Sequence, residues 1–98
     1  MPGGFGETSI AGEGEQALLM EVKPAVEGQL EKTFSEFAAE EYMTQVVAGT
    51  NYIFKVRADA GEYLHVKVHK PLPFRNAPPQ LMGVLAGKAP GDALQYFE

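Results

Sequence analysis

The apolar residues of the segment from Glu15 to Phe37 recur at intervals of three and four, which stacks them on one face of an α-helix. Pro24 lies inside this segment, where it removes one backbone donor and clashes with the carbonyl group four residues earlier. The period keeps its phase through Pro24, so the pattern predicts a single kinked helix. Its apolar stripe, which we expect to face the core, consists of Leu19, Val22, Val26, Leu30, Phe34 and Phe37.

After Phe37 the spacing of the apolar residues shortens towards two, which is typical of β-strands. The predicted strands are residues 41–47, 50–58, 62–70 and 80–86. Residues 62–70 alternate most clearly, and this predicts an antiparallel sheet with one buried and one solvated face. The apolar set is Leu64, Val66 and Val68, and the outward set is Tyr63, His65, Lys67 and His69. Because neither the helix stripe nor the apolar sheet face can be left in water, we expect them to pack together in an α+β fold.

The length of 98 residues predicts one domain, residues 1–98, with room for one hydrophobic core but not for two. The net charge of −5 disfavours nucleic acid and anionic membranes as partners, because both bind basic surfaces. The chain has no cysteine, which excludes disulfides, a thiol nucleophile and a cysteine-ligated metal. Since it also has no membrane-length apolar run and no signal-peptide pattern, we expect a cytoplasmic protein.

The segment Gln45, Val46, Val47, Ala48 and Gly49 joins two predicted strands, so we expect a hairpin turn near its end. Glycine permits a positive φ in such a turn and allows another backbone to come close. Two valines at a hairpin tip would be exposed, which suggests a small apolar edge that inserts into a groove. The alternative is that both valines belong to strands and face the core.

Residues 71–79 contain too many prolines for a strand or a helix, so we expect a second loop that exposes Leu72 and Phe74. In a meander of strands, this loop and the first hairpin lie at the same end of the sheet. The glycine-rich residues 1–14 are expected to form a mobile arm that joins this end, or else a frayed terminus without a role.

The sequence shows no catalytic pattern and no metal-binding pattern. His65 and His69 share one strand face but lie about 13 Å apart along it, which is too far for two ligands of one ion. Glu40 and Glu41 are neighbours on a strand and therefore point apart, so they are not a candidate carboxylate pair. We predict no catalytic residue, no metal site and no cofactor.

These features together resemble the stefins, the type 1 cystatins, which inhibit papain-like cysteine proteases. The resemblance covers nearly the whole chain. It rests on the hairpin segment and its continuation through residues 50–56, on Leu72 and Pro73 of the second loop, and on the ending 94–97, which is similar to that of the B-type stefins. Gly4, with Gly3 beside it, falls where the family has its functional glycine, and Pro24 falls where A-type stefins carry a helix proline.

The resemblance implies a cystatin fold, in which a five-stranded antiparallel sheet wraps around one long kinked helix. It also implies reversible, tight-binding inhibition of cathepsin-type proteases by a wedge that occludes the active-site cleft. The arm would occupy the non-primed side of the cleft and the two loops the primed side, covering the catalytic cysteine of the enzyme. The residues implied to contact the protease are Gly3, Gly4, Gln45, Val46, Val47, Ala48, Gly49, Leu72, Pro73 and Phe74.

The chain departs from the stefin pattern in three places. It lacks the arm cysteine of the B-type stefins, which excludes covalent dimers through that thiol. It has Phe74 and Arg75 where relatives carry more polar residues or glycine, and it has Gly83 near a position that carries tyrosine in relatives. The unusual second loop keeps an alternative open, namely a non-inhibitory or engineered binding scaffold on the same fold. A further expectation is a monomer that can exchange the strands around Gly49 and form a swapped dimer.

Overall fold

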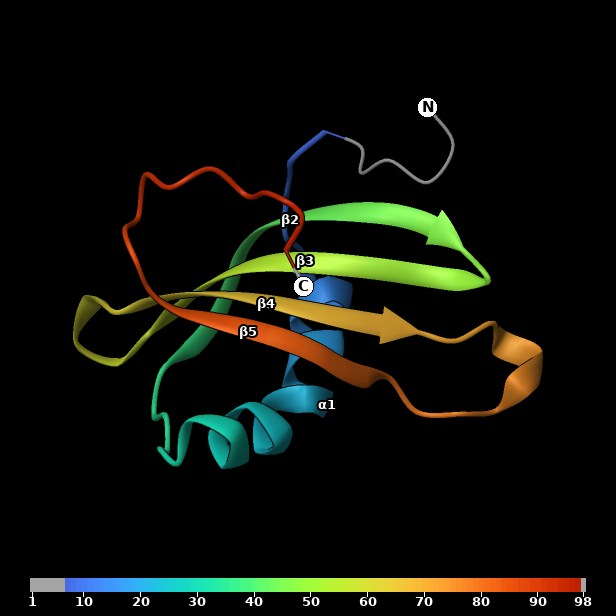
Figure 1. Cartoon of the computed structure of the whole chain (residues 1–98), viewed down its shortest axis with the longest axis horizontal. Coiled ribbons are helices and arrows are strands. Elements are labelled where there is room, and N and C mark those ends of the chain that lie inside the picture. Colours follow the sequence, from blue (N-terminus) through green and yellow to red (C-terminus); the bar gives the residue numbers. More distant parts are fainter. Residues whose placement is uncertain (1–6, 98) are drawn as a thin grey trace.

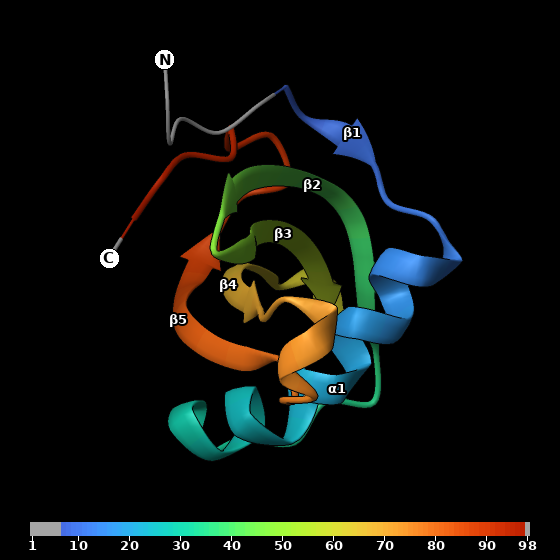
Figure 2. The same ribbon diagram turned by 90° about the vertical axis from the view of Figure 1, so that its right-hand side faces the viewer.

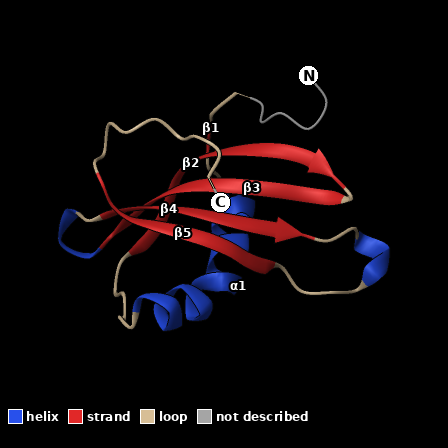
Figure 3. Ribbon diagram, in the orientation of Figure 1, coloured by secondary structure: helices blue, strands red, loops and turns tan. Residues whose placement is uncertain are grey.

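The computed structural model describes residues 7–97, which form one antiparallel sheet and one α-helix (Figure 1). The strands lie side by side in chain order, and their bounds are β1 Ser9–Ile10, β2 Phe37–Val47, β3 Gly49–Ala58, β4 Tyr63–Lys70 and β5 Gln80–Lys88. The helix α1, Glu13–Leu30, connects β1 to β2 and lies against one face of the sheet, which curves around it (Figure 2). The predicted α+β architecture, with antiparallel strands and a single helix, is therefore confirmed (Figure 3).

The hydrophobic core fills the space between α1 and the concave face of the sheet. Leu19, Val22 and Val26 of the predicted stripe are buried there, together with Leu18. Their neighbours on the sheet come from alternate positions of β3 and β4, and these are Phe54, Val56, Ala58, Leu64, Val66 and Val68. Full burial of one such side chain contributes about 1.5–3 kcal/mol, so this layer is what holds the helix on the sheet.

The helix ends at Leu30, seven residues before the predicted end at Phe37, and this part of the prediction is wrong. Glu31 adopts a left-handed conformation with φ 53°, which stops the helix, and the side chain of Glu27 accepts a hydrogen bond from the N–H of Phe34 at 2.8 Å. Phe34 and Phe37 are nevertheless buried and stacked, with ring centroids 5.5 Å apart. The apolar spacing thus continued past the helix because the connecting segment also faces the core.

Pro24 lies inside α1, as predicted for a single helix. The helix changes direction along its length, so that its first turns run behind the sheet and its last turns run along the lower edge (Figure 1). Proline cannot donate a backbone hydrogen bond, and a bend at such a residue is the expected consequence.

The resemblance implied a sheet of five strands, and the sheet has five. The residue pattern alone did not predict the first of them, because residues 1–14 were expected to be a mobile arm. Ser9 and Ile10 instead pair with Tyr42 and Glu41 of β2. The N–H of Ala11 also donates to the carbonyl oxygen of Glu40 at 3.0 Å. The part of the arm from residue 7 onward is therefore attached to the sheet edge, and only residues 1–6 of the predicted arm lie outside the described range.

The convex face of the sheet is not solvated along β4, contrary to the prediction. Tyr63, His65 and Lys67 are 8%, 2% and 7% exposed. The C-terminal segment covers part of this face, because it returns across the sheet on the side opposite the helix (Figure 2). Leu94 packs there against Met43 and Ile53 in a second small core.

Two lysines fasten this C-terminal segment to the sheet. Lys55 donates to the carbonyl oxygen of Pro90 at 2.9 Å, and Lys67 donates to that of Phe97 at 3.2 Å. The ammonium group of Lys67 also lies 4.1 Å from the centre of the Tyr96 ring. Both bonds place a charged donor on a backbone acceptor, which is the stronger class of hydrogen bond. Together with the packing of Leu94, these contacts attach the end of the described chain to the sheet.

Candidate functional site

The two predicted loops lie together at one end of the sheet. The turn between β2 and β3 and the connection between β4 and β5 both project from the right-hand end of the molecule in Figure 1. This placement follows from the meander, since β2–β3 and β4–β5 turn in the same sense. The geometric expectation drawn from the sequence is confirmed for these two loops.

Gly49 forms the joint between the two loops. Its φ is 109°, a region that residues with a side chain rarely adopt. A Cβ at this position would collide with the carbonyl oxygen of Lys70 and would lie 3.1 Å from Cε1 of His69 and 3.2 Å from Cα of Pro71. Glycine was expected to let another backbone come close to the turn. The backbone that lies close to Gly49 is the base of the second loop in the same chain.

The valines of the first hairpin belong to β2, yet their side chains do not enter the core. Val46 is 79% exposed and Val47 is 39% exposed, and Ala48 between the strands is exposed as well. Val46 is paired with Thr50 and Val47 with Gly49, so both valines sit on a regular ladder at the tip. Of the two interpretations of the sequence, the apolar tip is the one that the structure supports.

A chain of side-chain hydrogen bonds ties this hairpin to β4. Asn51 donates through Nδ2 to Oε1 of Gln45 at 3.0 Å, and its Oδ1 accepts from Nδ1 of His69 at 2.7 Å. Sequence reasoning missed the roles of Asn51 and His69. The available signal was their position on the same alternating face, combined with the register that pairs the two residues directly.

The second loop has a defined shape. Pro73–Arg75 form a 3₁₀ turn, η2, in which Arg75 donates its backbone N–H to the carbonyl oxygen of Leu72 at 3.0 Å. Asn76 follows in a left-handed conformation with φ 56° and donates to the carbonyl oxygen of Pro73 at 3.2 Å. Phe74 is 80% exposed at the top of this turn, so an aromatic ring is presented to solvent on a rigid support.

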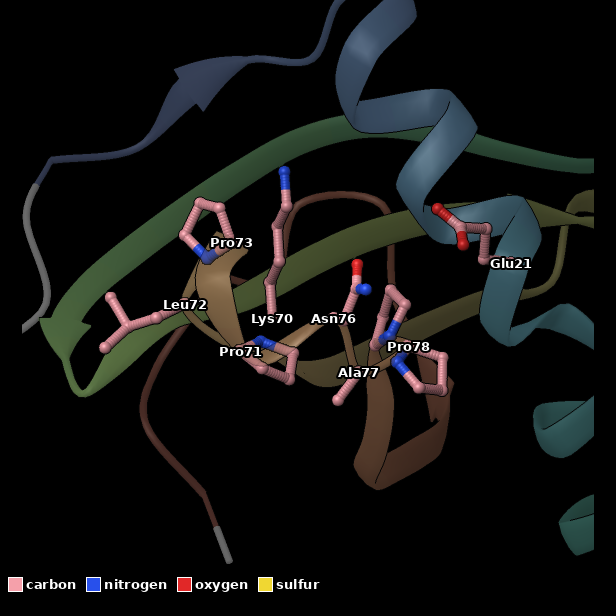
Figure 4. Close-up of a pocket in the computed structure, with 9 residues that line it drawn as sticks. Glu21, Lys70, Pro71, Leu72, Pro73, Asn76, Ala77 and Pro78 are labelled. Atoms are coloured by element: carbon pink, nitrogen blue, oxygen red, sulfur yellow. The ribbon is translucent and has the colours of Figure 1, made fainter.

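A hollow of about 500 Å³ lies behind the second loop, between this loop and α1. Figure 4 shows Glu21 of the helix on one side of the hollow and Lys70, Pro71 and Asn76 on the other. Four of the nine residues that line it are prolines, and Leu72 and Ala77 add further apolar surface. Because these rings restrict the backbone, the loop keeps its shape without a tight layer of side chains beneath it.

Gly3 and Gly4, the remaining predicted contact residues, lie outside the described residues. The described part of the arm is nevertheless held in a defined direction. Gln16 of α1 donates to the carbonyl oxygen of Phe37 at 2.9 Å and accepts from the N–H of Ala39 at 2.7 Å. This side chain fixes the helix to β2 beside the irregularity between Ala39 and Glu41, next to which β1 pairs.

The histidines have different surroundings. His65 is buried under the C-terminal segment, its Nε2 has no partner within the described residues, and burial lowers its pKa, with smaller contributions from the charges of Lys88 and Lys55. The prediction of a solvated His65 is therefore wrong.

Among residues 7–97 no group of three histidine or carboxylate side chains could hold a metal ion. In the same range no helix is both long and apolar enough to span a membrane.

Comparison with known proteins adds a family to this geometry. The cystatin domain model matches residues 3–91. Cystatin-A of Felis catus is 42% identical over 99% of both chains, and Cystatin-B of Paralichthys olivaceus is 39% identical over 97% of both. Leukocyte cysteine proteinase inhibitor 1 of Sus scrofa is 37% identical over 99% of this chain and 94% of its own length. These values do not single out the B type, to which the C-terminal ending pointed.

Proposed function

This chain belongs to the cystatin family, in its stefin branch, and from this premise we propose that it is a reversible, tight-binding inhibitor of papain-like cysteine proteases. Cystatins are protease inhibitors and not enzymes, so the expectation of a non-enzymatic role agrees with the family. The partners that we propose are cathepsin-type proteases. The whole chain, residues 1–98, would act as one domain in the cytoplasm.

The observation that carries this proposal is the pair of rigid loops at one end of the sheet, each with exposed apolar side chains at its tip. Val46 and Val47 supply the apolar surface of the first hairpin, and Phe74 supplies that of the second. Exposed apolar side chains that gather on one surface lower the solubility of a protein, and such a patch commonly marks a binding surface. A protease cleft is a concave surface that such a convex edge could fill.

Tight binding would follow from preorganisation. The first hairpin is held by the ladder of β2 and β3, and the second loop is held by the turn at Pro73–Arg75. Neither loop has to be ordered when the complex forms, which reduces the entropy lost on binding. In this mechanism the two loops would lie over the primed side of the cleft and Gly3 and Gly4 over the non-primed side. The catalytic cysteine would be covered and left unmodified, so inhibition would be reversible.

The test is a titration of active papain with the purified protein, followed by hydrolysis of a small fluorogenic peptide. Loss of activity in proportion to added protein, with recovery after dilution, is the expected result. Full activity at a large excess would contradict inhibition of papain and would favour the second candidate, a binding scaffold that serves a different partner. The exposed Phe74 beside Arg75 is the observation that favours this second candidate.

A further inference from the structure

The three segments of the proposed contact edge contain no acidic residue. Residues 1–6, 42–54 and 70–79 include none of the thirteen Asp and Glu residues of the chain, although its net charge is −5. They carry two cations, Lys70 and Arg75, both in or next to the second loop. The edge is therefore basic on a protein that is otherwise acidic.

These two cations are free to act on a partner. Both side chains are exposed, and within the part of the chain that the structure describes neither takes part in an ion pair. The acidic residue that shares the hollow with Lys70 is Glu21, and no ion pair joins them. The guanidinium carbon of Arg75 lies 6.0 Å from the centre of the Phe74 ring, so the charge accompanies the exposed aromatic group.

The cations elsewhere are mostly neutralised. Lys32 pairs with Glu62 at 2.5 Å, and Arg57 pairs with Glu36 at 2.8 Å. Lys32 and Glu36 lie in the segment before β2, and Arg57 and Glu62 lie beside the turn between β3 and β4. Both places are at the end of the sheet opposite the two loops (Figure 1). The ion pairs of Lys32 and Arg57 therefore lie at one end of the strands, whereas Lys70 and Arg75, which take part in no ion pair among the described residues, lie at the other.

From this separation, we infer that Lys70 and Arg75 are specificity-determining residues, and that the edge is built for papain-like proteases whose cleft carries carboxylates where the second loop docks. This inference rests on the proposed inhibitory function. An acidic cleft would attract the loop end and repel the remainder of the molecule, which orients the inhibitor before contact. Phe74 would fill an apolar depression while the guanidinium group of Arg75 meets a carboxylate at its rim, a geometry suited to paired hydrogen bonds.

The experiment compares association rates by stopped-flow fluorescence. The probe is a papain-like protease with acidic side chains on the primed-side rim of its cleft, together with a variant of this protease in which those side chains are replaced by their amides. The inhibitors are the wild-type chain, Arg75→Gln, the double variant Lys70→Gln/Arg75→Gln, and Lys88→Gln as control. Lys88 lies opposite Tyr63 on the β4–β5 ladder, at the far end of β4 and roughly 23 Å from Lys70 along the strand. Its replacement changes the net charge by the same amount as Arg75→Gln.

At about 0.01 M ionic strength, where charges act over about 30 Å, we expect association to slow roughly 3-fold for Arg75→Gln and about 10-fold for the double variant. Lys88→Gln should slow association clearly less than Arg75→Gln, because Lys88 lies farther from the docked loop and is already paired with Asp92. The differences should vanish at about 1 M salt and with the amide variant of the protease. Equal rates for Arg75→Gln and Lys88→Gln, with inhibition intact, would overturn this inference alone. Absence of inhibition at every salt concentration would remove the proposed function as well.

Discussion

The absent side chain of Gly49 allows the carbonyl oxygen of Lys70 to lie against the tip of the first hairpin. The two loops consequently share one base instead of moving as separate fingers. His69 reinforces this base, because its ring lies beside Gly49 and its Nδ1 is bonded to Asn51 on β3. A substitution at Gly49 therefore acts on both loops at once.

We expect Gly49→Ala to destabilise the fold by about 1–3 kcal/mol, since a φ of 109° is strained for alanine and the new methyl group meets Lys70. Inhibition should weaken more than this loss of stability explains, because the second loop must shift. Urea unfolding and papain titration on the same samples separate the two effects. Gly61→Ala is the matched control, since Gly61 also has a positive φ, of 75°, but lies in the β3–β4 turn with no atom within 4 Å of an added Cβ. A Gly49→Ala protein with unchanged stability would show that the base is not tight.

Val46 should matter for binding and not for stability. Replacement by serine removes apolar surface that is 79% exposed, so the free energy of unfolding should change by less than about 0.5 kcal/mol. If this surface is buried against a protease, the loss of about 1–1.5 kcal/mol raises the inhibition constant about 10-fold. Ile10→Ser is the control, because Ile10 is equally exposed but lies on β1. Similar inhibition by the two variants would argue against the apolar tip as a contact surface.

Stability should fall in mild acid because of His65. Burial lowers the pKa of this histidine below the ordinary value of 6.5, with Lys88 and Lys55 adding to the effect and Asp92 opposing it. The folded state therefore holds the neutral imidazole, while the unfolded chain binds a proton below about pH 6.5. Stability is full above this pH and declines as the pH falls, by at most about 1.4 kcal/mol per pH unit.

The measurement for His65 is urea unfolding between pH 7.5 and pH 5. His65→Gln should flatten this part of the pH profile. The pKa of Asp59 is lowered by hydrogen bonds from the backbone N–H groups of Ser35 and Glu36, so its contribution is lost only in stronger acid, below its ordinary value of 3.8. A profile for His65→Gln that matches the wild type would contradict the assignment.

Period-based reasoning predicted the parts of the fold in which a repeating pattern determines the structure. The helix stripe around Val22 and Val26, the strands on either side of Gly49, and the shared end of the two loops all follow from local spacing and the order of strands. The end of the helix could not be predicted from the sequence, because the residue that adopts the left-handed conformation there is Glu31 and not a glycine. The spacing of Phe34 and Phe37 then suggested more helix than exists.

The other differences arise from contacts between distant segments. The alternation in β4 correctly separated Val66 from His65, but it could not show that the C-terminal segment covers the second face. The strand pair of Ser9 with Tyr42 was hidden because two residues give no detectable period. For the candidate site, the exposed apolar tip could be predicted from the sequence, whereas the bonds through Asn51 could not.

The hairpin of β2 and β3 should also control self-association. The two strands contain 11 and 10 residues and are joined at Ala48, so opening at this point would let each strand pair with a second copy. In such a dimer the first hairpin no longer exists as a tip, and inhibition should be lost with it. We expect a dimer on size-exclusion chromatography after mild heating, and this dimer should be inactive against papain.

A disulfide across the hairpin tests this mechanism, because the chain has no other cysteine. Thr44 and Tyr52 are directly paired, so the double variant Thr44→Cys/Tyr52→Cys should close the hairpin when it is oxidised. The oxidised protein should stay monomeric and inhibitory after heating, and the same protein with its thiols reduced should form the dimer. Dimers of equal amount in both redox states would show that association proceeds without opening at Ala48.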